Sequence, residues 1–337
     1  MSGPSFNFEH EVEWGDVDDV SPMLRRVTAK NPSHFTFKGT GTYIVGRGNV
    51  AVIDPGPDDD KHIDSLLKAV DGETVTHILI THTHSDHSPG TAKLKEHHDA
   101  PVYAWDPSVI TVPPDDYFDG FFDNFPEDPE EKEKAEKAAA EDSGDGEVDK
   151  DPHEVPRETI EVEFEPDEIV SHGQRIEGDG MTFEALHTPG HISNHVSWGF
   201  EEEKAVFTGD HIMGWSTTVI PAPDGSLTDY MESLQVLIDR PGDELHYPTH
   251  GAPISNPQAF AAALAAHRNM RTEQVLECLA DGKTQILDMV KVMYADKPIK
   301  LYKPAALSVL SHLVHLEDTG RVTTDGPVVP GADWRLT

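Results

Sequence analysis

Apolar positions follow two different periods along this chain. Between His34 and Asp54 they alternate with polar positions, and turn residues 46–49 interrupt the pattern, so we expect two strands joined as a hairpin. Residues 62–70 have apolar positions three and four apart, which predicts a helix, and the apolar run at 77–81 predicts a buried strand after it. Alternating strands and helices indicate an α/β fold.

The alternation of strand and helix continues to about residue 251. We expect helices at 92–98 and 227–238 and strands at 102–104, 181–187, 196–198, 205–211 and 244–250. Four segments place a histidine or an aspartate at the C-terminal end of a predicted strand, namely His82, His191, Asp210 and His250. Because α/β folds build their sites at such strand ends, these residues are candidates for one common site.

The segment after the strand at 77–81 contains three histidines and an aspartate within six residues. His82 and His84 are two positions apart, so in extended backbone their side chains lie on one face. The turn sequence that follows brings Asp86 and His87 round toward the same point. Converging imidazoles and a carboxylate are the ligands of divalent first-row metals, whereas the alternative interpretation is a histidine-rich surface loop.

The order and context of these segments resemble the metallo-β-lactamase superfamily, whose signature reads here His82-Thr83-His84-Ser85-Asp86-His87. The resemblance covers roughly residues 30 to 255 and includes all five motif segments of the family in order. It implies an αββα sandwich with a two-metal site at one edge. Carried over to this chain, it implies a first metal held by His82, His84 and His191, and a second held by Asp86, His87 and His250, with Asp210 bridging both.

This resemblance implies hydrolysis with two divalent metal ions, most simply zinc, with iron or manganese as alternatives. Two such ions share a water and lower its pKa, and Asp86 is the candidate catalytic residue that orients the water and passes a proton to the leaving group. The expected substrates are small acyl compounds, namely a thioester, a lactone or a β-lactam. Asp210 replaces the cysteine of several true β-lactamases and resembles the glyoxalase II, lactonase and ribonuclease branches, so we expect β-lactam turnover to be weak or promiscuous.

Four further residues are candidates for supporting roles. His195 either supports a ligand or is a structural histidine, and Asp54 either supports a ligand or stabilises a turn. Ser216 and Thr217 either line the pocket or belong to a plain loop. For His211 a structural role is favoured, and the histidines outside the motifs are expected at the surface, namely His34, His62, His97, His98, His153 and His172.

Residues 115–168 differ from their surroundings because they contain 23 acidic and 5 basic residues and few large aliphatic ones. We expect an acidic insertion in the catalytic domain, either mobile or folded over the site as a lid, rather than core structure.

The composition narrows the functional classes. The chain has 337 residues, of which 26 are basic and 62 acidic, so its net charge of −36 repels nucleic acid at long range and is compatible with a salt-adapted host. The single cysteine, Cys278, excludes an intrachain disulfide and favours a reducing compartment. With no leader-like start and no long apolar run, the expectation is a soluble cytoplasmic protein without a membrane partner.

From about residue 258 the pattern becomes helical, which predicts a catalytic domain at 1–257 and a small second domain at 258–337. We expect helices at 259–280, 284–294 and 304–316, followed by a hairpin of 320–322 with 334–336. Three helices and a wing resemble the winged-helix tail of the lactamase-β-like protein 2 branch of the superfamily. That resemblance implies either hydrolysis of small molecules or cleavage of single-stranded RNA.

Two alternatives remain for this C-terminal segment. An endoribonuclease, or a nucleic-acid-binding protein with a vestigial metal site, would use the third helix to contact bases and phosphates. Residues 259–337 contain 9 basic and 9 acidic residues, and the helix at 304–318 has no lysine or arginine and offers only Ser308, Ser311, His312 and His315. A module for packing or homodimerisation is therefore favoured.

Overall fold

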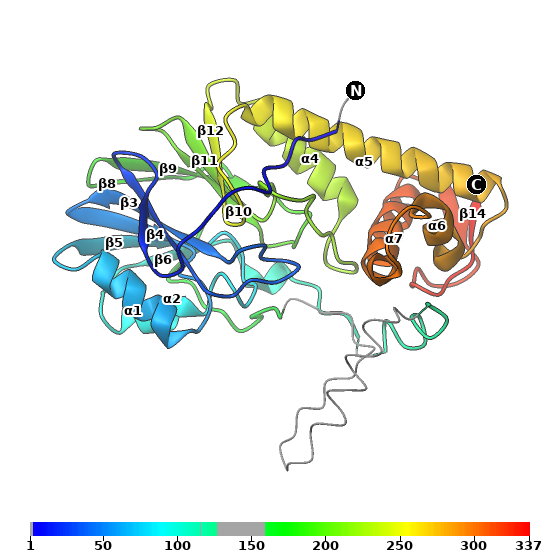
Figure 1. Ribbon diagram of the computed structural model, residues 1–337, viewed down its shortest axis with the longest axis horizontal. Helices are drawn as coiled ribbons and strands as arrows, with labels where there is room; N and C mark the ends of the chain where they lie inside the picture. Colours follow the sequence, from blue (N-terminus) through cyan, green and yellow to red (C-terminus); the bar gives the residue numbers. More distant parts are fainter. Residues whose placement is uncertain (1–2, 115, 127–158) are drawn as a thin grey trace, which may run out of the picture. The chain divides into compact units, whose positions relative to one another are not determined.

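The computed structural model describes residues 3–114, 116–126 and 159–337 (Figure 1). Its chain divides into two compact units. The first consists of Met1–Thr111, Glu158–Val219 and Asp224–His267, and the second of Val112–Arg157, Ile220–Pro223 and Arg268–Thr337. Most of the predicted acidic insertion, residues 127–158, lies outside the described residues.

The first unit contains a mixed seven-stranded sheet in the order β1 to β7, antiparallel from β1 to β4 and parallel from β4 to β7. Its strands are β1 Val17–Asp19, β2 Leu24–Thr28, β3 Gly41–Arg47, β4 Asn49–Ile53, β5 Thr74–Leu79, β6 Val102–Ala104 and β7 Glu168–Ile169. The predicted hairpin is confirmed as β3 and β4. Residues 34–40 are not extended as expected, because Phe37 (φ 57°) and Gly39 (φ 130°) turn the backbone there.

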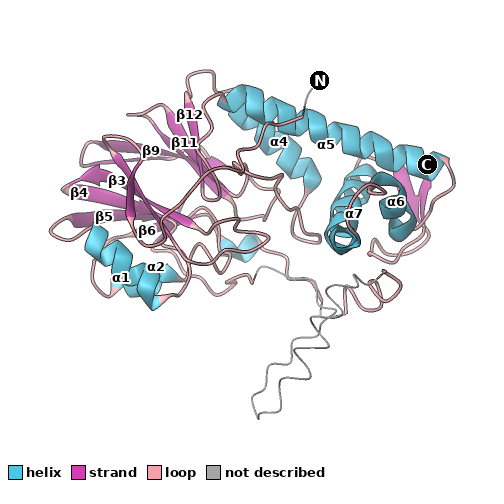
Figure 2. Ribbon diagram, in the orientation of Figure 1, coloured by secondary structure: helices cyan, strands magenta, loops and turns pink. Residues whose placement is uncertain are grey.

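A second sheet of five strands has the order β12-β11-β10-β9-β8 and is antiparallel except for the parallel pair β11 and β12 (Figure 2). Its strands are β8 Arg175–Gly178, β9 Met181–His187, β10 Val196–Phe200, β11 Ala205–Gly209 and β12 Leu245–Pro248. Three short helices cover the sheets, namely α1 Asp60–Ala69, α2 Gly90–Lys95 and α4 Leu227–Ile238.

Alternate residues of each strand belong to different layers. Tyr43 packs between the sheets in one core with Phe183 and Trp198 of the second sheet, whereas its neighbour Ile44 packs on the other side with Leu66 of α1. Figure 1 shows α1 and α2 together along one side of the first sheet and α4 beside the second. This layering confirms the expected αββα sandwich, because side chains alternate between the two faces of each strand.

The second unit contains the end of α5 Pro257–Ala280, together with α6 Ile286–Met293, the 3₁₀ turn η2 Ile299–Leu301, α7 Tyr302–Asp318 and the antiparallel pair β13 Val322–Thr324 and β14 Trp334–Leu336. Met289, Leu313 and Trp334 lie in its core, so the winged-helix arrangement with its predicted hairpin is confirmed. A search of the described helices finds no segment of the length and apolar character that a bilayer crossing requires.

An aromatic segment at the start of the predicted insertion belongs to the core of the second unit. Phe125 is 6% exposed there, and Phe118, Phe121 and Phe122 pack against the same cluster. The expectation of a fully solvated insertion is therefore wrong for residues 116–126. Clustered aromatic rings bury enough apolar area to outweigh the acidic composition around them.

Candidate metal centre

The first group of candidate ligands joins the loop after β5 to the loop after β9. His84 Nδ1 lies 3.0 Å from His82 Nε2 and 3.0 Å from His191 Nε2, and all three rings are buried. The ligand atoms of the three residues all lie within 4.8 Å of one another. Zinc in tetrahedral coordination, with Zn–N bonds of about 2.0–2.1 Å, separates its ligand nitrogens by about 3.3 Å.

Hydrogen bonds on the far side of two rings identify which nitrogens carry protons. The Thr81 hydroxyl gives its single proton to Asp54 Oδ2 (2.7 Å), so it accepts from His82 Nδ1–H (3.1 Å). His191 Nδ1–H donates to the Val219 carbonyl (2.6 Å). Burial lowers the pKa values of His82 and His191 below the usual histidine value, so both rings are neutral. Since each ring has its single proton on Nδ1, both Nε2 atoms present a lone pair toward His84. Two lone pairs directed at one point fit a cation.

The second group lies in the same loop and after β12. Asp86 Oδ2 is 3.4 Å from His87 Nε2 and 3.3 Å from His250 Nε2. Asp210, which follows β11, has Oδ1 at 3.6 Å from His87 Nε2 and 3.4 Å from His250 Nε2. Asp210 also groups with His82 and His87 within 4.8 Å, so it lies between the two sets.

Three of these atoms have no hydrogen-bond partner within the described part of the chain, namely His87 Nε2, Asp210 Oδ1 and His250 Nε2. A buried polar atom without a partner costs about 1–3 kcal/mol. Nitrogen and carboxylate oxygen atoms that share this deficit and face a common point fit a divalent cation, which would satisfy all of them at once.

The charges of the second group differ from those of the first. Burial opposes ionisation of Asp86, but the His87 and His250 rings outweigh it and hold the pKa of the carboxyl below its usual value. Burial likewise opposes the charged form of His250, yet Asp210 and Asp86 raise its pKa to about 10. Metal binding at this group therefore releases protons from its imidazoles.

Asp54 and His195, two of the four candidates for supporting roles, both contact this cluster. Asp54 follows β4 in a left-handed conformation (φ 50°), and its Oδ2 accepts from His87 Nδ1–H at 2.9 Å. His195 is buried and its Nε2 accepts from the backbone N–H of Asp210 at 3.2 Å. Both contacts favour the supporting interpretation over the structural one.

Ser216 and Thr217 are half-buried, and the Ser216 hydroxyl donates to the Thr217 carbonyl at 3.3 Å. It is their neighbour Thr218 whose hydroxyl donates to the Asp210 carbonyl at 2.8 Å. The pocket role of Ser216 and Thr217 stays a prediction, and in the same segment it is Thr218 that contacts Asp210.

His211 and His62 are buried outside the ligand groups. His211 packs against Tyr230 with ring centroids 4.7 Å apart, in agreement with a structural role. The expectation of a surface position is wrong for His62, which is 3% exposed and has Nε2 2.9 Å from the Thr42 hydroxyl. His62 lies one turn before Leu66 on the buried face of α1, and this spacing was the available signal.

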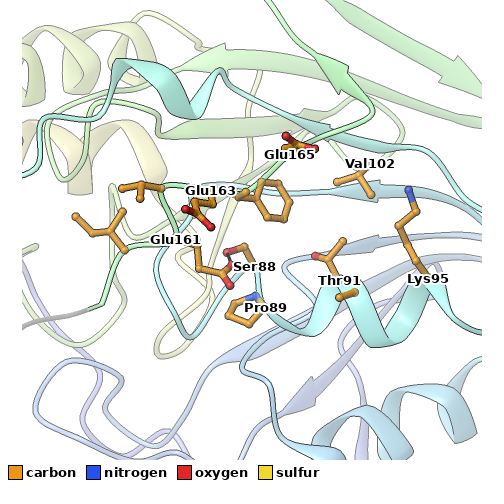
Figure 3. Close-up of a pocket in the computed structure, with 12 residues that line it drawn as sticks. Ser88, Pro89, Thr91, Lys95, Val102, Glu161, Glu163 and Glu165 are labelled. Carbon is orange, nitrogen blue, oxygen red and sulfur yellow. Dashed lines mark hydrogen bonds between the residues drawn. The ribbon is translucent and has the colours of Figure 1, made fainter.

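A second chain segment braces the loop that carries the ligands. The Ser85 N–H donates to the Thr159 carbonyl and the Glu161 N–H to the Thr83 carbonyl, both at 2.8 Å. The Ser88 hydroxyl donates to the Glu161 carboxylate, and Figure 3 shows these two side chains next to each other. Because this segment lies far from the loop in sequence, the brace was not predictable from either motif.

Figure 3 shows a pocket of about 530 Å³ beside this brace, lined by α2, by β6 and by residues 160–165. Its lining includes Ser88 and Glu161 but none of the seven candidate ligands. The pocket therefore adjoins the back of the ligand loop and is not the place where a substrate would meet the metal cluster.

Comparison with known families and proteins gives matches over both units. The family described as "Metallo-beta-lactamase superfamily" matches residues 36–250, and the one described as "Beta-lactamase associated winged helix domain" matches residues 286–334. A "Beta-lactamase-like protein 2 homolog" of Drosophila melanogaster is 28% identical over 319 residues, which cover 91% of each chain. An "Atrochrysone carboxyl ACP thioesterase" of Passalora fulva is 30% identical over 281 residues, covering 80% of this chain but only 65% of the relative.

Solved structures show the same fold. A metallo-beta-lactamase family protein from Thermus thermophilus superposes with a TM-score of 0.65 at 21% identity, over 94% of this chain and 100% of that one. A beta-lactamase domain protein from Burkholderia ambifaria gives a TM-score of 0.68 at 19% identity, over 99% of this chain and 97% of that one. At these identities the likeness concerns the fold alone.

Proposed function

Because the chain belongs to the metallo-beta-lactamase superfamily, we propose that this hydrolase is binuclear and acts on small acyl substrates. One observation carries the proposal, namely that Asp210 lies between two groups of buried ligand-type side chains. In this proposal the first metal is held by His82, His84 and His191, the second by Asp86, His87 and His250, and Asp210 bridges them.

The residues of the site divide the chemistry among them. The two ligand groups would hold two divalent cations, zinc in our proposal with iron or manganese as alternatives, which when bound would supply a water of lowered pKa and polarise the acyl oxygen of the substrate. Asp86 is ionised and buried beside both imidazoles of the second group, so its carboxylate orients the attacking water as a hydrogen-bond acceptor. The carboxylate then takes the proton that this water loses and, as a general acid, passes it to the leaving group.

Thioesters come first among the acyl substrates of this proposal. The Passalora fulva relative is named a thioesterase. A thiol is also a good leaving group, because a single proton transfer is sufficient for its departure. Lactones are the next choice. With an aspartate rather than a cysteine at position 210, we expect weak turnover of β-lactams.

Small substrates are also favoured over RNA by the second unit and by the charge. Ser311 and His312 of α7 are 2% and 1% exposed, so they pack inside the unit and cannot reach base edges. The net charge of −36 repels polyanions. In our proposal the second unit serves packing or homodimerisation, and the single cysteine, Cys278, supports a cytoplasmic location.

Hydrolysis assays with metal-reconstituted protein test this function. The panel contains a glutathione thioester, a lactone, nitrocefin and a fluorescent single-stranded RNA, and the variants are Asp210→Ala and His84→Ala. We expect thioester or lactone turnover that falls to the uncatalysed rate in both variants and persists in the exposed controls Asp325→Ala and His97→Ala. RNA cleavage without acyl turnover, lost in both site variants, would replace the proposal with an endoribonuclease, and activity that survives both variants would remove the metal site itself.

A further inference from the structure

A directed chain of hydrogen bonds ends on the Asp86 carboxylate. The Thr40 backbone N–H donates to Asn31 Oδ1 at 2.9 Å, and because an N–H only donates, this contact identifies the oxygen end of the amide. The Asn31 NH₂ group therefore faces Thr40 Oγ1, also at 2.9 Å, and donates to it. Since the amide NH₂ cannot accept, the single hydroxyl proton of Thr40 is directed to Asp86 Oδ2, at 2.7 Å.

The same turn also contacts the other end of the second ligand group. The Gly39 carbonyl accepts from His250 Nδ1–H at 3.2 Å, which leaves Nε2 of that ring facing Asp86 and Asp210. The N–H of Gly41 donates to the Thr249 carbonyl at 3.0 Å. The consecutive residues Gly39, Thr40 and Gly41 thus contact two ligands of the second group, His250 and Asp86, and Thr249, the residue before His250.

The first ligand group is supported from other parts of the chain. His191 is oriented by the Val219 carbonyl, and His82 by the Thr81 hydroxyl. Because the contacts given above for the turn between β2 and β3 go to the second group, a change in this turn acts on the second group more than on the first.

The turn requires a glycine at position 39. Gly39 has φ 130°, and a Cβ at this position would lie 2.1 Å from the Ala29 carbonyl oxygen, so only glycine fits. Thr40 itself is fully buried and lies next to this constrained residue. Its hydroxyl is therefore presented to Asp86 from a turn whose geometry requires glycine at the preceding position.

On the basis of the proposed binuclear function, we propose that Thr40, oriented by Asn31, is a positioning residue for the second metal ion. It donates to Asp86 Oδ2, the oxygen that faces His87 and His250, and so keeps this carboxylate aimed at the second group. Removing the hydroxyl weakens the second metal and leaves the first in place. Loss of such an outer partner typically lowers metal affinity about 10- to 100-fold.

The experiment measures the two stepwise zinc affinities of metal-free protein by competition with a chromogenic chelator, and the zinc retained per chain after desalting. Thr40→Val keeps the β-branched shape and the backbone N–H but removes the hydroxyl, Thr40→Ser restores the hydroxyl, and Thr76→Val is a matched control on β5. We expect two zinc ions per wild-type chain, a second step weakened about 10- to 100-fold in Thr40→Val with the first step unchanged, and recovery in Thr40→Ser.

Thermal unfolding of each metal-free variant shows whether a fall in zinc affinity reflects a loss of positioning or a loss of folded protein. Thr40→Ala replaces Thr40→Val if the valine variant does not fold. Wild-type affinities at both steps in Thr40→Val would overturn the role of Thr40 while leaving the binuclear function standing. An equal fall at both steps, without recovery in Thr40→Ser, would mean that Thr40 is only structural. A wild-type chain that binds a single zinc ion would overturn the binuclear function, and the role of Thr40 with it.

Discussion

The backbone N–H of Asp210 donates to the imidazole Nε2 of His195 over 3.2 Å, and both residues are buried. Burial lowers the pKa of His195 well below its usual value, so the ring is neutral and its one proton is on Nδ1. That proton is donated to the Thr188 hydroxyl at 2.9 Å. His195 therefore orients the residue that lies between the two ligand groups, and its nitrogens have partners other than a metal.

Replacing His195 with leucine removes this acceptor at similar volume. The Asp210 N–H and the Thr188 hydroxyl then lose a partner inside the protein, so we expect the free energy of unfolding to fall by about 1–3 kcal/mol. Zinc affinity falls as well, because the backbone that carries Asp210 is less constrained. Urea unfolding and chelator competition measure the two effects. Wild-type values in both would show that the contact does not orient Asp210.

Asp54→Asn should weaken zinc binding at both ligand groups without unfolding the protein. Asparagine tolerates the left-handed backbone, and its single oxygen is needed by the Thr81 N–H, which now donates to Asp54 Oδ1 at 2.7 Å. The NH₂ group would then face His87 Nδ1–H, donor against donor, and move the ring proton to Nε2. The same NH₂ group would face the Thr81 hydroxyl, which would then donate to His82 Nδ1 and disturb the first group as well. We therefore expect zinc to be lost from both groups, measured as zinc ions retained per chain after desalting.

The matched control for this variant is Asp179→Asn. Asp179 also has a left-handed backbone (φ 55°) but is exposed, and its Oδ1 accepts from Asn49 Nδ2 rather than from a candidate ligand, so the exchange there tests the backbone effect alone. Two zinc ions retained by Asp54→Asn would contradict the assigned role of Asp54. Loss of zinc from both variants would point to the backbone instead.

The brace behind the ligand loop contributes to stability through Ser88 and Glu161 (Figure 3). Glu161→Ala removes the acceptor of the Ser88 hydroxyl, so we expect the free energy of unfolding to fall by about 1 kcal/mol. Glu161→Gln retains an acceptor oxygen and should recover most of this loss. Urea unfolding gives the comparison, with Glu163→Ala as an exposed control on the same segment. Equal effects of Glu161→Ala and Glu163→Ala would mean that the brace contributes nothing.

Acid destabilisation has an identifiable contributor in His246 on β12. This ring is buried, neither nitrogen has a partner within the described residues, and burial, with a smaller effect of Arg240, lowers its pKa to about 3. In the unfolded chain His246 has an ordinary histidine pKa, so between this pKa and about pH 3 it binds a proton that it does not bind in the folded chain. Stability is therefore complete above pH 6.5 and falls as the pH decreases toward 3, by about 2 kcal/mol between pH 7.5 and pH 5.

His246→Leu should remove this part of the pH dependence. We expect the difference in unfolding free energy between pH 7.5 and pH 5 to shrink by about 2 kcal/mol relative to wild type. The exposed control His97→Leu should keep the wild-type difference. Unfolding in urea at the two pH values provides the measurement, and an unchanged difference in His246→Leu would show that the ring accepts a proton in the folded state.

Several features of the fold were predictable because they depend on local patterns. Successive residues of a strand face opposite layers, and this alternation predicted β3 and β4 as a hairpin, whereas the sandwich around them came from the family resemblance. The apolar spacing of residues 304–316 similarly indicated α7. Composition was less reliable, because averaging charge over residues 115–168 obscured the aromatic cluster around Phe125.

By itself, the sequence determined the order of the elements and the short loop in which His82, His84, Asp86 and His87 are too close together to separate. Their role as ligands stays a prediction. Only the tertiary structure decided what surrounds them, since Thr40 meets Asp86 across 46 positions of the chain and His195 meets Asp210 across 15. A threonine hydroxyl or a backbone carbonyl has no sequence pattern of its own. Its partner is chosen by how the two sheets pack, because hydrogen bonds form between atoms that the fold brings within about 3 Å.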